Sequence, residues 1–211
     1  MTECCLYSSI LFLISCLDVF GQSGGKIQSR AFDEPWITDS ASTMLIPYRY
    51  DARLFSSNKM ATSGDYYANF IVYDFKSDNY RTLFPADTYI KILEGYSYYS
   101  RGEEKKNSFS ADWIFYLVKS DDYNGNNKID EQDPFVLYVS NRQGGNLRAI
   151  TKASENVVSF TIFEKLGFVL LKIQRDENQN KDFEPNDNDR YLVKLSLLNL
   201  SFGNKIEARQ P

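Results

Sequence analysis

The fold of this chain is decided by residues 113–139, which read Trp113-Ile-Phe-Tyr-Leu-Val-Lys-Ser-Asp-Asp-Tyr-Asn-Gly-Asn-Asn-Lys-Ile-Asp-Glu-Gln-Asp-Pro-Phe-Val-Leu-Tyr-Val139. Two short apolar runs, 113–118 and 135–139, flank a polar segment. Both runs are rich in β-branched and aromatic residues and lack helical spacing, so they predict β-strands. Pro134 stands where the second strand would begin, a position that proline tolerates. The polar segment is therefore predicted to connect the two strands of a hairpin, not two helices.

The polar segment is repeated 54 residues later. Residues 122–133 (loop 1) correspond to residues 176–187 (loop 2), and the second copy also lies between apolar runs, at 168–173 and 191–195. In both loops, Asp or Asn occupies positions 1, 3 and 5, an acidic residue occupies positions 9 and 12, and an apolar residue occupies position 8. Asp, Asn and Gly also form ordinary solvated turns. Two copies with matched spacing favour a common ligand instead.

This spacing is that of the twelve-residue calcium loop of the EF-hand kind. Calcium takes about 6–8 oxygen ligands, so a loop must curl and direct alternate side chains inward, while the carbonyl of position 7 adds an oxygen. We predict two Ca²⁺ sites, one in each loop. Their expected ligands are Asp122, Asn124, Asn126, Lys128, Asp130 and Asp133 in loop 1, and Asp176, Asn178, Asn180, Asp182, Glu184 and Asp187 in loop 2.

The two loops differ at position 6, where the backbone turns sharply and glycine is usual. Loop 1 has Asn127 there and loop 2 has Lys181. Asn adopts left-handed dihedral angles more readily than Lys, so we expect the first site to be better formed than the second. Position 12 is Asp in both loops, where EF-hands usually have Glu. The shorter side chain requires a tighter loop, as in dockerin-like variants of the motif.

Strand–turn–strand units recur along the chain, at residues 70–84, at 135–151 and, with a degenerate second strand, from residue 191. With the strand that precedes it, each unit would form a small antiparallel sheet, and repeats of about 40–60 residues are typical of propeller blades. We expect an all-β fold of about three antiparallel propeller-like blades, with the calcium loops inserted in hairpins. Closed propellers have about 4–8 blades. Either the sheets form an open or partial array, two chains complete a ring, or the architecture is a different one.

Residues 114–173, with Asn141-Arg-Gln-Gly-Gly-Asn-Leu-Arg-Ala-Ile-Thr151 at their centre, resemble TolB-type β-propeller repeats. They are most similar to the versions in exported lipoproteins of Bacteroidetes type, where EF-hand-like loops interrupt the blades. The resemblance covers residues 110–197 well and 43–90 faintly, and the Asp-x-Asn-x-Asn pattern is its most specific part. It implies a propeller-like fold, export, calcium-stabilised loops and docking to other envelope proteins. It implies no enzyme activity.

Residues 6–17 form an uncharged apolar run that is too short to span a bilayer and is typical of a signal-peptide core. Two cleavage points compete: a lipobox-like sequence ending at Cys16, which would be lipidated, and an ordinary signal-peptidase site near Gly21. The alternative is an apolar first strand. We expect a signal peptide at 1–21, a tether at 22–42 and the β-propeller-like domain at 43–211. The product would be an outer-membrane or periplasmic lipoprotein or a secreted protein.

The amino-acid composition argues against several classes of function. The chain has no histidine, its three cysteines all lie in the first 16 residues, and its net charge is −4. These features disfavour imidazole catalysis, thiolate metal sites and nucleic-acid partners. We expect a non-catalytic calcium-binding protein of the cell envelope with a scaffold or protein-interaction role. Its partner would be an envelope protein or a glycan, its contact with the membrane a lipid anchor only, and a homodimer is a further option.

Two alternatives remain open. Exposed aromatic rings could bind sugars, which would make the chain a carbohydrate-binding module; the candidates are Tyr96, Tyr98, Tyr99 and Trp113. A pair of carboxylates about 5–10 Å apart could support a histidine-free glycoside hydrolase or lyase. The candidates for that chemistry are Asp74, Glu94, Asp112 and Glu164.

Overall fold

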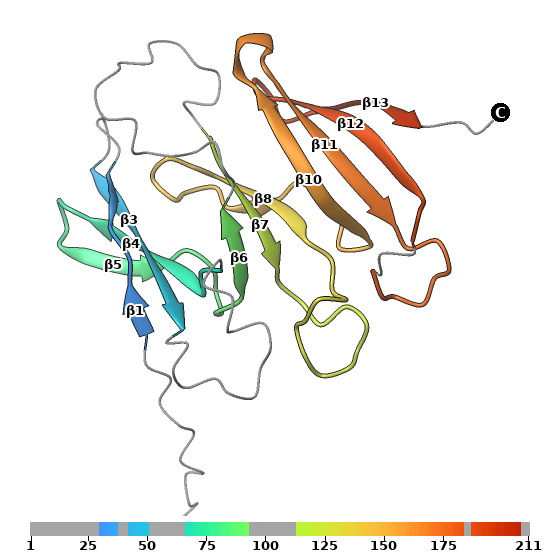
Figure 1. Cartoon of the computed structure of the whole chain (residues 1–211). Helices are drawn as coiled ribbons and strands as arrows, with labels where there is room; N and C mark the ends of the chain where they lie inside the picture. The colour runs from blue at the N-terminus through green and yellow to red at the C-terminus, as the bar shows by residue number, and fades with distance from the viewer. Residues whose placement is uncertain (1–29, 38–41, 51–65, 93–112, 184–186, 208–211) are drawn as a thin grey trace, which may run out of the picture.

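The computed structural model describes residues 30–37, 42–50, 66–92, 113–183 and 187–207. In these residues the protein is all-β, with three antiparallel sheets and a single 3₁₀ turn at Glu164–Leu166 (Figure 1). The expected all-β fold with about three antiparallel sheets is thereby confirmed. Closure of such sheets into a propeller stays a prediction. The described part contains no helix long and apolar enough to cross a membrane.

The three sheets follow one another along the chain, and neighbouring strands in each sheet are antiparallel. Sheet A consists of β1 (Arg30–Phe32), β2 (Trp36–Ile37), β3 (Thr43–Tyr50), β4 (Asn69–Asp74) and β5 (Asn79–Thr82). Sheet B consists of β6 (Tyr89–Ile92), β7 (Trp113–Lys119), β8 (Val136–Asn141) and β9 (Arg148–Ala149). Sheet C consists of β10 (Glu155–Phe163), β11 (Phe168–Arg175), β12 (Arg190–Ser196) and β13 (Phe202–Glu207).

Sheet B is the middle layer, and both of its faces are buried. Along β7, Ile114, Tyr116 and Val118 belong to the core shared with sheet A. The alternate residues Phe115 and Leu117 belong to the core shared with sheet C. This explains why β7 is an unbroken apolar run: successive side chains point to opposite faces, and each face meets another sheet. Burying one such side chain contributes about 1.5–3 kcal/mol, so the two cores hold the sheets in a stack.

Sheet A begins within the segment 22–42 that was expected to be a tether. Strands β1 and β2 both pair with β3. Arg49 Nε donates to Asp33 Oδ2 at 2.8 Å, and the centres of the Phe32 and Tyr48 rings lie 6.2 Å apart. These two strands are too short to show the alternating pattern that identifies a strand in sequence, and they precede the expected start of the domain at residue 43. The expected signal peptide, with Cys16, lies outside the described residues.

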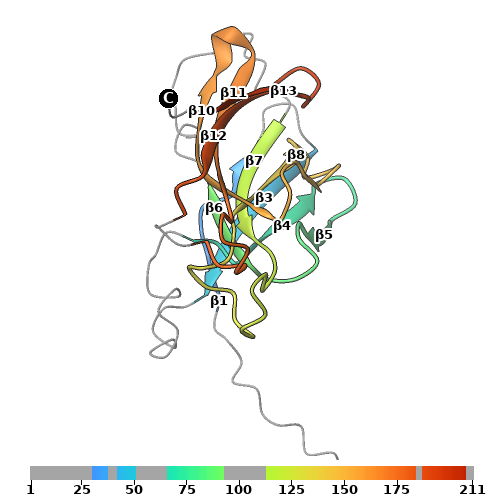
Figure 2. The ribbon, with the colours of Figure 1, turned by 90° about the vertical axis from the view of Figure 1, so that its right-hand side faces the viewer.

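Both predicted calcium loops connect adjacent strands, as expected. Loop 1 lies between β7 and β8, and loop 2 lies between β11 and β12. In Figures 1 and 2 both loops extend from the lower end of the stack. The three sheets thus form a scaffold that brings two segments 54 residues apart to one end of the molecule.

Candidate metal site in the paired loops

Loop 1 is wound around the carboxylate of Asp122. This carboxylate accepts hydrogen bonds from the backbone N–H groups of Gly125, Asn126 and Asn127 at 2.6–3.0 Å. The side-chain oxygen of Asn124 accepts from the N–H of Asn126 at 3.0 Å. Positions 1 and 3 therefore direct oxygens into the loop, as the spacing predicted.

Loop 2 repeats this arrangement. The Asp176 carboxylate accepts from the N–H groups of Asn180 at 3.2 Å and Lys181 at 2.8 Å. The side-chain oxygens of Asn178 and Asn180 accept from the N–H groups two residues further on, at 2.9 and 2.8 Å. In loop 1, Asn126 does the same at 2.9 Å. Positions 1, 3 and 5 thus have equivalent roles in the two loops.

The backbone of the two loops also turns in the same places. Gly125 and Asn127 have positive φ angles of 78° and 65° in loop 1. Gln179 and Lys181, which occupy the same positions 4 and 6 in loop 2, have φ angles of 59° and 68°. Residues other than Gly and Asn rarely adopt positive φ angles. Loop 2 therefore reaches the same backbone shape at a higher conformational free energy.

The second half of loop 1 closes on a buried carboxylate. Asp133 is only 1% exposed. Its Oδ1 accepts from the N–H of Tyr123 and its Oδ2 from the N–H of Asp130, both at 2.8 Å. Asp187, at the same position of loop 2, is also buried, while Glu184 lies outside the described residues. Position 12 therefore joins the end of loop 1 to its beginning.

A buried side chain from the preceding strand anchors the end of each loop. Lys119, 3% exposed, donates its ammonium to the carbonyls of Asp130, Glu131 and Asp133 at 2.6–3.0 Å. Burial lowers the pKa of Lys119 to about 8, against the opposing effect of the neighbouring carboxylates. Gln174 is buried as well, and its Nε2 donates to the carbonyl of Asp187 at 3.1 Å.

The two loops contact each other directly. Asn124 Nδ2 donates to Asp182 Oδ1 at 2.6 Å, which joins position 3 of loop 1 to position 7 of loop 2. The N–H of Phe183 donates to the carbonyl of Gln132 at 2.9 Å. The rings of Tyr123 and Phe183 lie 5.9 Å apart. The apolar position 8 of loop 2 is thus buried against loop 1, and the loops form one unit.

A chain of hydrogen bonds in sheet C connects the ends of the loops a second time. The N–H of Phe135, just after loop 1, donates to Asn156 Oδ1 at 2.9 Å. Asn156 Nδ2 donates to Gln174 Oε1 at 2.9 Å, and Gln174 holds the carbonyl of Asp187. Neither Asn156 nor Gln174 carried a signal in the sequence, because their roles depend on pairing between β10 and β11.

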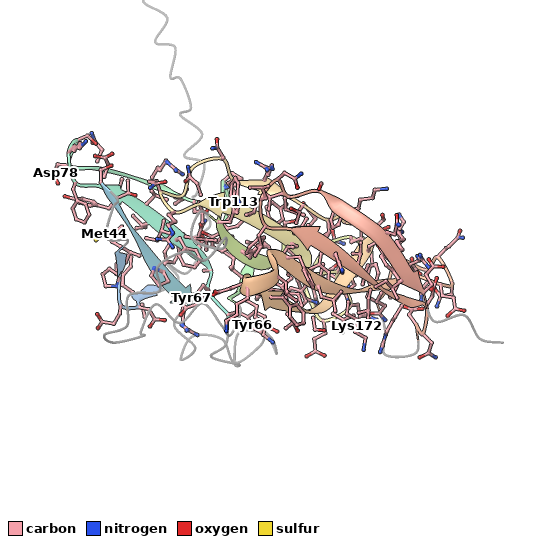
Figure 3. The ribbon with its side chains drawn as sticks, turned by 90° about the horizontal axis from the view of Figure 1, so that it is seen from above. Met44, Tyr66, Tyr67, Asp78, Trp113 and Lys172 are labelled. Atoms are coloured by element: carbon pink, nitrogen blue, oxygen red, sulfur yellow. The ribbon has the colours of Figure 1, made fainter. Side chains whose placement is uncertain are left out.

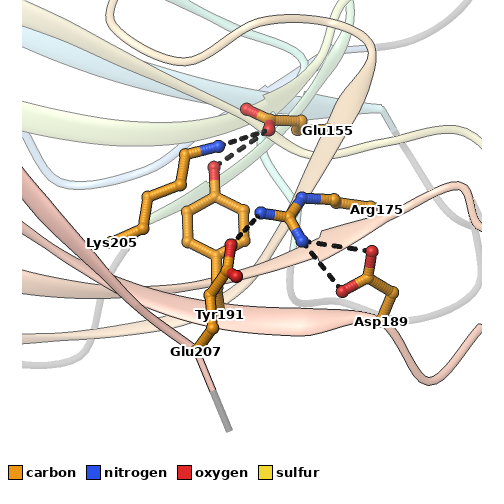
Figure 4. Close-up of polar contacts among 6 residues, drawn as sticks. All are labelled: Glu155, Arg175, Asp189, Tyr191, Lys205 and Glu207. Carbon is orange, nitrogen blue, oxygen red and sulfur yellow. Dashed lines mark hydrogen bonds and ion pairs between the residues drawn. The ribbon is translucent and has the colours of Figure 1, made fainter. Parts of the chain in front are cut away.

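The base of loop 2 is held by a polar cluster that spans the four strands of sheet C (Figure 4). Arg175, directly before the loop, donates to both oxygens of Asp189 at 2.9 and 3.1 Å and to Glu207 Oε1 at 2.6 Å. Tyr191 donates to Glu155 Oε1 at 2.9 Å. Burial, and then the bond to Glu155, raise the pKa of Tyr191 well above its usual value. The hydroxyl therefore stays protonated and the cluster keeps its geometry at ordinary pH.

The donor set of the loops fits a hard cation. All predicted ligands are carboxylate, amide or carbonyl oxygens, and no sulfur or imidazole is present. A carboxylate offers about four acceptor sites and an amide oxygen two. In Asp122, Asn124 and Asn126, the bonds described above use fewer acceptor sites than the side-chain oxygens offer. In the described residues, however, no group of three or more His, Cys, Asp or Glu side chains is gathered closely enough to hold a metal. An ion would therefore need the Asn and backbone oxygens as well as the carboxylates.

The other predicted site residues are dispersed. The half-buried Trp113 packs against the core between sheets B and C, and its Nε1 donates to the carbonyl of Leu197 at 3.1 Å. The Asp74 carboxylate accepts two backbone N–H groups of its own turn, which lowers its pKa. Glu164 begins the 3₁₀ turn of sheet C, so it does not share a sheet with Asp74. The remaining candidates, Tyr96, Tyr98, Tyr99, Glu94 and Asp112, lie outside the described residues.

Comparisons with known proteins add no identity. No protein-family model matches the chain, and a search of curated proteins finds no significant match.

Proposed function

We propose that this chain is an exported, non-catalytic calcium-binding protein whose paired loops bind two Ca²⁺ ions at one end of a stacked β-scaffold. The observation that supports this most strongly is the equivalence of the two loops. They share the same backbone turns and the same inward-directed oxygens at positions 1, 3 and 5. Ordinary solvated turns have no reason to repeat such an arrangement at matched positions.

Calcium suits these loops better than magnesium. Calcium accepts 6–8 oxygens in flexible geometry, whereas magnesium demands near-ideal octahedral coordination and keeps several waters. Long loops with mixed amide, carbonyl and carboxylate oxygens can supply the flexible coordination shell that calcium accepts. Loop 1 also places three carboxylates, Asp122, Asp130 and Asp133, within one twelve-residue segment. A divalent cation would offset their mutual repulsion.

The expected role of the ions is structural. An ion that binds only the folded state stabilises it by about 2.7 kcal/mol when its concentration is 100 times its Kd. Calcium sites of extracellular modules have Kd values of about 10⁻⁴–10⁻³ M, useful where calcium is abundant. The apolar run at 6–17 predicts such a location. Ordered loops at one end of a rigid scaffold suit docking to an envelope protein.

Thermal unfolding with and without calcium tests this function. We expect millimolar calcium to raise the melting temperature relative to excess chelator by several degrees. Asp122→Ala and Asp176→Ala should each remove part of that rise, and the double variant should remove all of it. Asp121→Ala is the matched control, because Asp121 is exposed, lies outside the twelve-residue loop and bonds only to Ser120 in the described residues. A melting temperature that is the same in calcium and in excess chelator would contradict the proposal.

A further inference from the structure

The stack of sheets ends on two faces against which no other described strand packs. Sheet B is covered on both sides, whereas the two core clusters of the described residues cover one face each of sheets A and C. Figure 3 shows Met44 and Asp78 of sheet A at one end of the stack and Lys172 of sheet C toward the other. These two faces are the places where a further sheet could be added to the stack.

The outer face of sheet A is apolar and aromatic. The register of β3, β4 and β5 places Met44, Tyr73 and Tyr80 in one row and Ile46 and Ile71 in the next. Together with part of β1, this face lines a groove of about 620 Å³. Tyr80 is 72% exposed. Exposed apolar surface of this kind is typical of an interaction site.

The outer face of sheet C is apolar with cationic side chains. The register places Phe163 next to Phe168, Leu170 next to Lys194, and Lys172 between Ser159 and Leu192. Ile206, paired with Leu192, is 52% exposed. The ammonium of Lys194 lies 4.8 Å from the centre of the Phe168 ring.

The charges on the two faces are opposite. The charged residues that line the groove of sheet A are Asp33 and Glu34, and Asp78 accepts a hydrogen bond from the hydroxyl of Tyr73 on the same face. Asp33 is paired with Arg49, so Glu34 and Asp78 supply the net negative charge. The outward strand positions of β11 and β12 carry Lys172, Arg190 and Lys194, and no acidic residue.

We propose that the outer face of sheet A in one copy docks against the outer face of sheet C in a second copy, and that two copies close a ring of six sheets. The contact would repeat the face-to-face packing already present between sheets A and B and between sheets B and C. Pairing A with A would bring carboxylates together, and pairing C with C would bring ammonium groups together, so charge favours A with C. Such a head-to-tail contact must close or continue as a filament.

Closure with two copies is the simplest solution. Two chains of three sheets give six, within the range of about 4–8 for closed propellers. Both contacts in the ring are then identical, and neither copy retains an uncovered face. The calcium loops lie at the strand ends and not on these faces, so this inference does not rest on the proposed calcium binding.

The mass of the protein in solution, followed by light scattering and sedimentation over a range of concentrations, tests the proposal. We expect twice the chain mass. Lys172→Glu/Lys194→Glu makes both faces acidic, and Glu34→Lys/Asp78→Asn makes the outer face of sheet A basic like that of sheet C. Each variant should dissociate at concentrations at least about tenfold higher than the unaltered protein. Lys152→Glu, an exposed change between β9 and β10, is the control and should not.

Mixing the two interface variants gives the sharpest outcome. In a mixed pair, both contacts again join opposite charges, so a dimer containing one copy of each variant should form while each variant alone stays monomeric. Circular dichroism and melting temperature verify that the variants are folded. The proposal is overturned by a monomer at all concentrations, as expected for a foreign protein or glycan partner. A dimer insensitive to these charges, or a mass that keeps growing with concentration, also overturns it.

Discussion

Loop 1 and loop 2 reach the same shape by different means. In loop 1, Gly125 and Asn127 adopt positive φ angles easily, but a buried ammonium, that of Lys119, holds the end of the loop. In loop 2, Gln179 and Lys181 adopt the same angles at a cost, but the neutral amide of Gln174 holds the end. Folding of loop 1 is therefore opposed by the burial of a charge, and folding of loop 2 by unfavourable backbone angles.

This difference shows which features the loops require. The inward oxygens and the fixed end of the loop are present in both copies, whereas the residues that allow the turn and the charge of the anchor vary. The shared features are those that a bound cation would need. The variable features determine the free energy that is required to form each loop. The following substitutions exchange or remove these features one at a time.

Removal of the buried carboxylate of loop 1 should have the largest effect. Asp133→Ala leaves the N–H groups of Tyr123 and Asp130 without their acceptor in a buried site. We expect a loss of about 2–4 kcal/mol in the free energy of unfolding, even in chelator. Asp122→Ala, whose partners are exposed, should cost about 1 kcal/mol under the same conditions. Urea unfolding measures both, and equal losses would show that Asp133 has no special structural role.

Exchange of the anchor of loop 1 should change how stability depends on pH. Below pH 8, Lys119 is charged in both the folded and the unfolded state, and the cost of burying its charge is fully present. Between pH 8 and about 10.5 the folded state releases the proton first, because burial lowers the folded pKa to about 8. The free energy of unfolding should therefore rise across this range, by up to about 3 kcal/mol.

Lys119→Gln gives loop 1 the anchor of loop 2 and should abolish that rise. Chemical unfolding in chelator at pH 7.5, 9 and 10.5 compares the two proteins, so other groups that titrate in this range cancel in the difference. The same slope in the variant would mean that another group causes it.

The contact between the loops should contribute a smaller, measurable coupling. Asn124→Ala and Asp182→Ala each remove one side of the 2.6 Å hydrogen bond between them. A double-mutant cycle should give a coupling of about 0.5–1.5 kcal/mol, because the bond involves a carboxylate but is only partly buried. Additive losses would indicate that the loops behave independently.

Exchange of the residues at position 6 should have the smallest effect. Lys181→Asn should stabilise loop 2 by about 0.5–1 kcal/mol, since Asn adopts the observed φ of 68° more easily than Lys. The reverse change in loop 1, Asn127→Lys, should cost a similar amount. Melting temperatures of the two variants should therefore shift in opposite directions, and shifts in the same direction would contradict the conformational explanation.

The sequence predicted what depends on local pattern. The apolar runs identified β7, β8, β11 and β12, and the matched spacing identified the inward oxygens of both loops. The anchors Lys119 and Gln174 could not be found in this way. Their roles depend on where a strand end lies relative to a distant backbone carbonyl, which only the three-dimensional arrangement sets.

The first strands and the outer faces of the fold could not be predicted from the sequence either. Strands β1 and β2 are two or three residues long, so they show no periodicity, and their pairing with β3 placed part of the expected tether in sheet A. The outer faces of sheets A and C became recognisable only after the register assigned each residue to a face. The propeller resemblance suggested an incomplete ring but not which surfaces could complete it.

Calorimetric titration of the metal-free protein with calcium tests the central claim most directly. We expect two Ca²⁺ ions per chain, with one ion lost in Asp122→Ala, the other lost in Asp176→Ala, and none bound by the double variant. Absence of binding in millimolar calcium, or binding that survives both substitutions, would contradict it.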